Sequence, residues 1–235
     1  MDRKTLQDPV AYHAELARDW DARYLKKSFR ARLHAVRGCV KDRDLHAQLW
    51  VDAGCGSGTL SRWLAEQGCC VRGFDAAPEM VRTAASIAPG STCRYPLSFE
   101  CIETIASMPV PSGSLDGVLC SSVLEYVPDP DACLREFARV LKPGGLLLVS
   151  VPNAQSVVRM GRATLHRLGR SLGKRWFRVA DYSHHQYSIE RFNQLLATHG
   201  FRLDKVLPFG SRLPMWLQRQ RFGGTLLMFG VAKEV

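Results

Sequence analysis

The stretch Leu49-Trp50-Val51-Asp52-Ala53-Gly54-Cys55-Gly56-Ser57-Gly58 decides the fold of this chain. A short apolar run ends at Asp52, three glycines then alternate with other residues, and a helical pattern begins near Thr59. Because glycine has no Cβ, such a turn bends sharply and brings its backbone close to a ligand. The N-terminus of the following helix adds N–H groups without intrahelical partners. The stretch therefore predicts a strand–turn–helix unit with a ligand site at its turn.

The residues outside this stretch alternate between strand patterns and helical patterns. Runs typical of strands cover residues 49–51, 71–74, 97–102, 115–120, 146–151, 202–208 and 225–232. Helical patterns cover residues 59–67, 131–141 and 188–198, and another helix opens near Ala77-Pro78. This alternation predicts an α/β fold, with one mostly parallel sheet of seven strands and helices on both faces. The last two strands are close enough in the sequence to pair, so we expect an antiparallel last strand.

We expect a single domain over residues 1–235, with an N-terminal helical cap over 1–47 and a basic helical insertion over 154–187. The length of 235 residues suits one α/β domain with its own core. Lys142-Pro143-Gly144-Gly145 predicts a turn into the fifth strand. The polar N-terminus and the strand-sized apolar runs indicate a cytoplasmic protein without a secretory signal or membrane span. The eight cysteines include no CxxC pair, so we expect neither a disulfide framework nor a metal site.

Asp75 is the expected partner of the glycine turn. It follows the second strand, 21 residues after Gly54. In a doubly wound parallel sheet, the ends of neighbouring strands meet at one crevice. The carboxylate of Asp75 is therefore expected within reach of a ribose diol bound at the turn.

Two nucleotide-like cofactors compete for this turn. A dinucleotide fingerprint needs G-x-G-x-x-G, but Thr59 stands at the place of its third glycine. Asp52, just before the turn, suits a cationic amino group better than a pyrophosphate. S-adenosylmethionine carries an ammonium group, a sulfonium and an adenosine but no phosphate, so we favour this cofactor. A nucleotide-dependent oxidoreductase and a plain glycine-rich turn remain the alternatives.

The sequence also resembles a known family. Residues 51–58, Gly73-Phe74-Asp75 and residues 140–145 look like the corresponding motifs of the class I methyltransferases, which have a Rossmann-like fold. Residues 120–130 and the run Glu103-Thr104-Ile105 are similar to the O-methyltransferase subgroup of ubiquinone biosynthesis. The resemblance covers residues 28–153, about half of the chain. Its motifs are specific for the cofactor and much less so for the substrate.

The resemblance implies a set of cofactor-binding residues. Gly54 and Gly56 would approach the methionine part, and Asp75 would hold the ribose hydroxyls. Arg32, with Arg30 as the alternative, would reach the cofactor carboxylate, and Ser121 would line the methionine end. Thr104 and Ile105 would border the adenine, and Met80 would pack on its face. Two positions depart from the pattern, because Tyr126 replaces a histidine of the subgroup and Thr104 replaces an aspartate found in many class I enzymes.

Methyl transfer to oxygen gains from a base near the acceptor hydroxyl. His184 and His185 precede a helix in a loop expected above the carboxyl ends of the strands, and histidine titrates near neutral pH. Glu125 is an alternative base, with a structural or positioning role as the competing interpretation. Asn153, after the fifth strand, is expected to line the acceptor pocket. The alternative for the two histidines is that one caps the helix and the other is solvated.

The formal net charge of +10 is concentrated in one segment. No acidic residue lies between Glu136 and Asp181, whereas nine lysines and arginines do. Within residues 157–176, one helical stripe is apolar or small: Val157, Gly161, Leu165, Leu168, Leu172 and Trp176. The other face carries the basic side chains of Arg159, Arg162, His166, Arg167, Arg170 and Lys174. This pattern is typical of an interfacial membrane helix.

Three interpretations of the basic segment stay open. We favour a lid that also meets an anionic membrane surface, which suits a small-molecule or lipid-like methyl acceptor. A lid with solvated arginines is the plainer alternative. We rank RNA contact lower, because aromatic residues are not interleaved among the arginines for base stacking. For the chain as a whole, the alternatives to the small-molecule enzyme are an RNA methyltransferase and a catalytically silent cofactor-binding module.

Overall fold

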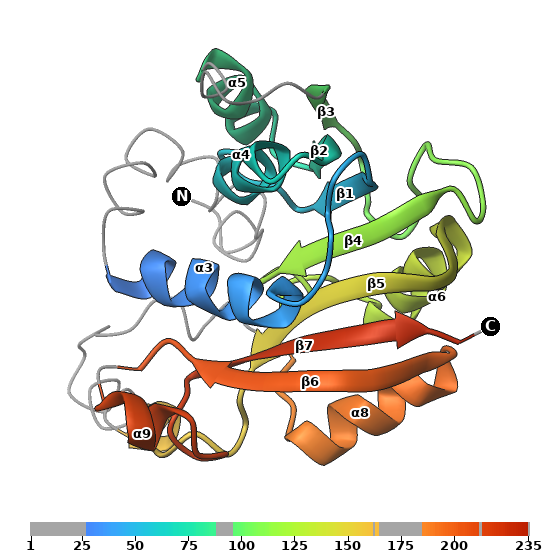
Figure 1. Ribbon diagram of the computed structural model, residues 1–235. Helices are drawn as coiled ribbons and strands as arrows, with labels where there is room; N and C mark the ends of the chain where they lie inside the picture. Colours follow the sequence, from blue (N-terminus) through green and yellow to red (C-terminus); the bar gives the residue numbers. More distant parts are fainter. Residues whose placement is uncertain (1–26, 88–95, 162, 165–184, 212, 235) are drawn as a thin grey trace, which may run out of the picture.

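The computed structural model describes residues 27–87, 96–161, 163–164, 185–211 and 213–234 (Figure 1). Its centre is a seven-stranded sheet in the order β3-β2-β1-β4-β5-β7-β6. The strands are β1 (Leu49–Ala53), β2 (Cys70–Asp75), β3 (Leu97–Cys101), β4 (Leu115–Ser121), β5 (Leu141–Pro152), β6 (Phe201–Phe209) and β7 (Leu226–Lys233). The described helices are α3 (Lys27–Val40), α4 (Thr59–Glu66), α5 (Pro78–Ser86), α6 (Pro130–Val140), α8 (Ile189–Thr198) and α9 (Met215–Gln218).

The pairing of the strands confirms the expected α/β fold. The strands β3, β2, β1, β4 and β5 are parallel to one another. The last strand, β7, lies between β5 and β6 and is antiparallel to both. The carboxyl ends of β1, β2 and β4 therefore open on the same edge of the sheet.

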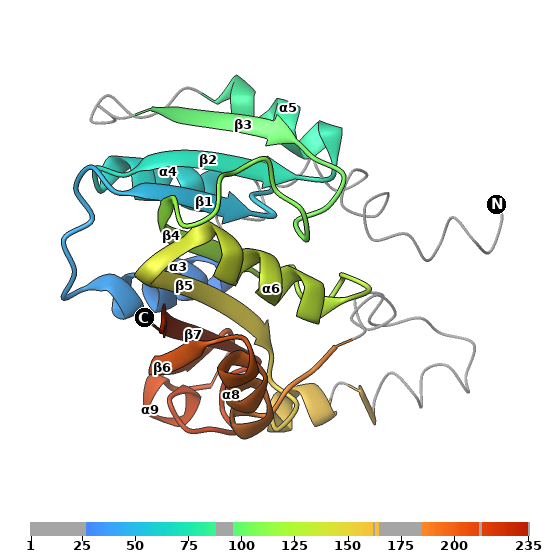
Figure 2. The same cartoon turned by 90° about the vertical axis from the view of Figure 1, so that its right-hand side faces the viewer.

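Helices cover both faces of the sheet, as Figures 1 and 2 show. On one face, α6 and α8 pack through Leu134, Phe137 and Phe192 against the inward side chains of the central strands. On the other face, α3 and α4 pack through Val36 and Leu64. Both clusters are apolar and fully buried, so the sheet forms the middle layer of one continuous core.

The start of the fifth strand differs from the expectation. Lys142-Pro143-Gly144-Gly145 does not precede β5 but forms an irregularity within it. Leu141 already pairs with Leu115, and Leu146 then pairs with Gly117. Gly144 takes a φ of 74°, which lets the extra residues leave the ladder and return to it. The strand is therefore longer than its apolar run.

The cap and the insertion are described only in part. Of the cap expected over residues 1–47, the structure describes residues 27–47 and extends its helix to Val40. Of the insertion, residues 157–161 and 163–164 are helical, and the rest of the expected basic helix lies outside the described residues. Within the described part of the chain, no helix is long and apolar enough to cross a membrane.

A glycine in the centre of the sheet gives a direct test of this packing. Gly117 in β4 pairs with Trp50 in β1, and a Cβ added to Gly117 would lie 2.2 Å from Cε2 of Trp50. Trp50 is fully buried and has no room to move away. We expect Gly117→Ala to lower the free energy of unfolding by about 1–3 kcal/mol, as overpacking of a core does.

Urea denaturation of both variants measures this effect. Gly161→Ala is the matched control, because a Cβ there would meet nothing within 4 Å among the described residues. In a helix, this control is expected to leave stability unchanged or raise it by up to about 1 kcal/mol. Equal midpoints for Gly117→Ala and the wild type would contradict the packing described here.

Candidate functional site

The glycine turn follows β1 and is held by the end of β2. The N–H groups of Gly54 and Cys55 both donate to the carbonyl of Phe74, at 2.7 and 2.9 Å. Gly54 and Gly58 have φ angles of 80° and 74°, a region that side chains disfavour. A Cβ at Gly54 would lie 2.3 Å from the side chain of Val123, and one at Gly58 would lie 2.5 Å from the Phe99 ring. Both positions therefore require glycine.

Asp75 joins this turn to the next helix. One oxygen of its carboxylate accepts from the N–H of Gly56 at 2.8 Å, and the other accepts from the N–H of Ala77 at 2.9 Å. The structure thus places Asp75 beside Gly56 at the ends of β1 and β2, as the sequence predicts. A carboxylate has about four lone-pair positions, so two bonds leave capacity for a ligand hydroxyl.

Asp52 lies beneath the turn and is 2% exposed. Its Oδ2 accepts a hydrogen bond of 2.6 Å from the hydroxyl of Ser61 in α4. Burial raises the pKa of Asp52 to about 7. The hydrogen bond from Ser61 opposes this rise. The charge of Asp75 also raises the pKa, and that of Arg32 lowers it. A cation bound near the turn would favour the ionised form of Asp52.

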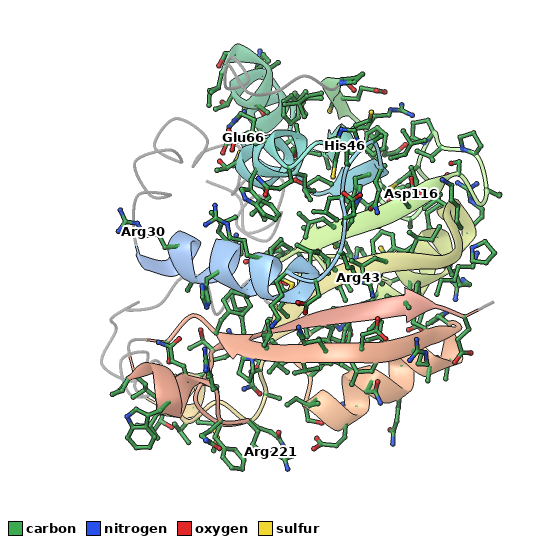
Figure 3. All side chains as sticks on the ribbon, in the orientation of Figure 1. Arg30, Arg43, His46, Glu66, Asp116 and Arg221 are labelled. Carbon is green, nitrogen blue, oxygen red and sulfur yellow. The ribbon has the colours of Figure 1, made fainter. Side chains whose placement is uncertain are left out.

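Arg32 lies over the ends of β4 and β5. Its Nη2 donates to the Ser122 hydroxyl at 2.9 Å, and the N–H of Ser122 donates to the Ser150 hydroxyl at the same distance. The Ser121 and Ser150 hydroxyls are 3.2 Å apart. Arg30, the alternative to Arg32, is exposed at the start of α3 (Figure 3). The geometry therefore favours Arg32 as the arginine of this site.

The sequence did not reveal the roles of Ser122 and Ser150. Ser150 stands inside the apolar run of β5, where a single serine gives no signal. Ser122 has a φ of 59°, and a positive φ outside glycine is uncommon in folded proteins. That conformation turns its N–H toward Ser150, and it depends on contacts that no local pattern records.

The expected adenine side is formed after β3. Ile105 and Met80 are buried, whereas Thr104 is exposed and its hydroxyl accepts from the N–H of Ala106 at 3.1 Å. The N–H of Ile102 donates to the carbonyl of Asp75 at 3.0 Å, which ties this loop to the glycine turn.

An ion pair in α6 between the half-exposed Arg139 and the buried Glu136 holds the same loop, and sequence reasoning missed it. Oε1 of Glu136 accepts from the N–H of Met108 at 2.6 Å, and Nη2 of Arg139 donates to the carbonyl of Val110 at 2.9 Å. The pair itself is closed by a bond of 2.7 Å from Arg139 Nε to Glu136 Oε2. The hydrogen bonds from Arg139 and Met108 lower the pKa of Glu136 and outweigh its burial.

Glu125 lies in the turn after β4 and is 4% exposed. Burial raises the pKa of its carboxyl group to about 7, against its own backbone N–H and the charges of Arg32 and Arg159. Among the described residues, its Oε2 has no hydrogen-bond partner. This oxygen is therefore buried without a hydrogen bond to any residue that the structure describes.

The structure describes two of the three residues expected near the acceptor after β5. The Nε2 atom of His185 lies 3.1 Å from the carbonyl oxygen of Val127, so the ring joins this segment to the turn after β4. His184 lies outside the described residues. Asn153 is fully buried, and its amide nitrogen donates to the carbonyls of Arg221 and Gly224 at 2.8 and 2.9 Å. Asn153 thus fastens the segment before β7, and its expected place in an acceptor pocket stays a prediction.

Comparison with known proteins adds the family. Residues 51–149 match the family model of the methyltransferase domain. Ubiquinone biosynthesis O-methyltransferase from Xanthomonas oryzae pv. oryzae (strain PXO99A) is 40% identical over 136 residues, which are 57% of this chain and 56% of that relative. The enzyme of the same name from Xanthomonas axonopodis pv. citri (strain 306) is 40% identical over 103 residues, 44% of this chain and 42% of that protein. The chain thus spans about half the length of the curated relatives that it matches.

Solved structures match over nearly the whole chain. The magnesium protoporphyrin IX methyltransferase of Synechocystis PCC 6803, solved with bound SAH, is 19% identical with a TM-score of 0.64, over 97% of this chain and 88% of that one. A chain from the complex between the Haloferax volcanii Trm112 methyltransferase activator and a methyltransferase gives a TM-score of 0.68 at 19% identity, over 95% and 98% of the two chains. These two likenesses show the fold. Residues 51–149, which include the glycine turn, are similar to the methyltransferase domain, and the chain shares its fold with these solved methyltransferases.

Proposed function

We propose that this chain transfers a methyl group from S-adenosylmethionine to an oxygen atom of a small, lipid-like acceptor. The observation that carries this proposal is the turn in which Gly54 leaves no room for a Cβ and Asp75 holds the N–H of Gly56. When bound, the cofactor supplies a methyl group that its sulfonium already activates. The protein then has to align the acceptor and exclude water.

The residues at the turn fit this cofactor. Asp52 is a buried acid that suits a cationic ligand, and Asp75 keeps lone pairs for a diol. Arg32 is the nearby cation for a ligand carboxylate, and Ser121 lies beside it at the end of β4. The buried acid Asp52 beneath the turn disfavours a pyrophosphate, which supports S-adenosylmethionine over a dinucleotide.

Two observations support transfer to oxygen. The curated relatives named above are O-methyltransferases. A buried carboxyl group with a raised pKa is suited to take the proton of a hydroxyl. The substitution of Tyr126 for the usual histidine of that subgroup favours a different acceptor.

A labelled-methyl transfer assay tests this function. The protein is incubated with methyl-labelled S-adenosylmethionine and a cell extract separated into lipid, RNA and protein fractions. Because the proposed acceptor is lipid-like, we expect the label in the lipid fraction, in a product that resists mild alkaline hydrolysis as an ether does.

Label in RNA would support the RNA methyltransferase and contradict the proposal. Cofactor binding without transfer to any fraction would instead support a catalytically silent binding module. A mock reaction with heat-denatured protein is the control for transfer by other enzymes in the extract.

We further propose that this enzyme meets an anionic membrane surface through the beginning of the basic segment and the neighbouring α9 region. Among the described residues, four of the five exposed large apolar side chains lie on these two elements: Val157, Met160, Trp216 and Phe222. We call this set the apolar surface. The N–H of Val157 donates to the carbonyl of Phe222 at 3.2 Å, which joins the two elements.

Charge supports the choice of an anionic partner. The sequence has no acidic residue between Asp204 and Glu234, and Arg219 and Arg221 are exposed. The guanidinium of Arg221 (Figure 3) lies over the ring of Phe222 in the apolar surface. Glu190 pairs with Arg221 and partly offsets its charge. Apolar side chains surrounded by arginines are typical of proteins that bind at the membrane interface. The lid role of the basic segment belongs to the same proposal.

Vesicle flotation tests the membrane contact. We expect the wild type to float with phosphatidylglycerol-containing vesicles at low salt, and to float much less at high salt because the charges are screened. A Trp216→Ser, Phe222→Ser double variant should lose most of this binding. Leu49→Ser is the matched control, because Leu49 is also an exposed apolar side chain but lies on β1.

Absence of flotation at low salt would sink the membrane proposal. An equal loss of binding in the Leu49→Ser variant would do the same, since it would show no special role for the apolar surface. Neither result bears on methyl transfer itself, which the labelled-methyl assay measures in solution.

A further inference from the structure

Glu125 is a buried acid whose second oxygen no described residue uses. Its side chain is 4% exposed, and Oε2 has no hydrogen-bond partner within the described chain. Leaving a buried acceptor unpaired costs about 1–3 kcal/mol, and more for a charged group. Such groups in native structures call for a specific explanation, and a catalytic role is one of the recognised explanations.

The position of Glu125 relates it to the glycine turn. It follows the end of β4, and the described charges that act on its carboxyl group are Arg32 of α3 and Arg159 of the helical segment after β5. Arg32 also acts on Asp52, beneath the turn. Ligands of α/β proteins bind at the carboxyl ends of such strands. Glu125 thus follows the end of β4 and feels the charges of Arg32 and Arg159.

We infer that Glu125 Oε2 takes up the proton that the acceptor hydroxyl loses during methyl transfer. This inference rests on the proposed function and narrows it, because the acceptor must then be a hydroxyl that is protonated when it binds. A phenol-like hydroxyl fits best, since its proton is acidic enough to pass to a carboxylate as the new bond forms.

The atoms and charges of this step balance. The acceptor oxygen forms a bond to the methyl carbon while the bond between that carbon and the donor sulfur breaks. The sulfur keeps the electron pair of the broken bond and becomes a neutral thioether. The proton of the acceptor hydroxyl passes to Glu125 Oε2, which releases it to solvent after the methyl ether leaves.

The surroundings of Glu125 determine how the step depends on pH. Burial raises its pKa to about 7, while Arg32, Arg159 and its own backbone N–H oppose this rise. The neighbouring Cys120 thiol stays neutral, because burial raises its pKa well above the ordinary value. A base is most effective when its pKa lies near the working pH. Since only the carboxylate accepts a proton, the rate should rise with pH and level off above about 7.

A comparison of oxygen and sulfur acceptors tests this role. The probes are 4-octylphenol, which is protonated at pH 8, and 4-octylthiophenol, which is ionised there and needs no base. We expect Glu125→Gln to lower the rate with the phenol about 100-fold or more, in the range that a lost general base gives. The rate with the thiol should fall less than about tenfold, and the step near pH 7 should disappear from the phenol profile.

Glu136→Gln is the matched control, because Glu136 is also a buried glutamate but holds the loop after β3. It should leave the ratio of phenol to thiol rates unchanged. Glu125→Asp is the conservative variant and should keep the pH step with a reduced rate. An equal loss with both probes, or a wild-type profile that is flat between pH 6 and pH 8, would overturn the inference.

A measurement without cofactor or acceptor gives an independent readout. The folded pKa of Glu125 lies above its ordinary value of 4.5, so the folded protein holds this proton more tightly than the unfolded chain. The contribution of Glu125 to stability is therefore greatest at low pH and is lost as the pH rises toward 7. We expect the unfolding free energy of the wild type, relative to Glu125→Gln, to fall over this range. A constant difference would contradict the inferred titration.

If the wild type transfers no methyl group to any acceptor, the result contradicts the proposed function, on which the role of Glu125 depends. If it transfers methyl groups and Glu125→Gln matches it with the phenol, only the role of Glu125 fails. The two failures are therefore distinguishable.

Discussion

The two oxygens of the Asp75 carboxylate join the glycine turn after β1 to the start of α5. One accepts from the N–H of Gly56, in the turn after β1, and the other accepts from the N–H of Ala77, before α5. The turn itself also depends on β2, because the carbonyl of Phe74 accepts from two of its N–H groups. The parallel pairing of β1 and β2 brings these groups to one edge of the sheet. A single acid thus sets the shape of the turn and keeps capacity for a ligand hydroxyl.

Two acids are buried around this turn, and one arginine acts on both of them. Asp52 and Glu125 are both buried, and burial raises the pKa of each to about 7. Arg32 lowers the pKa of both, so it is the charge that these two acids share. Buried acids that can still ionise near neutral pH are common where a cation binds or a proton moves. The structure therefore places one such acid under the turn and the other after the end of β4.

The sequence predicted those parts of the fold and site that depend on local patterns. Apolar runs and the glycine spacing located the strands, and the 21-residue interval from Gly54 to Asp75 correctly placed Asp75 beside the turn. It could not predict groups that meet only in three dimensions, such as the contact between Ser122 and Ser150 or the bonds from Asn153 to the segment before β7. The start of β5 was missed for a similar reason, because the pairing of Leu141 with Leu115 overrides a strong local turn signal.

The central claim is that the glycine turn and Asp75 form the binding site for S-adenosylmethionine. Calorimetric titration of S-adenosylmethionine into the wild type, Asp75→Ala and Asp116→Asn tests it most directly. Asp116 is an acid at the opposite, amino end of β4, where it pairs with Lys142 (Figure 3). The account predicts at least about tenfold weaker binding for Asp75→Ala, a loss of about 1.4 kcal/mol, and nearly unchanged binding for Asp116→Asn. Wild-type affinity in the Asp75→Ala variant would contradict the account.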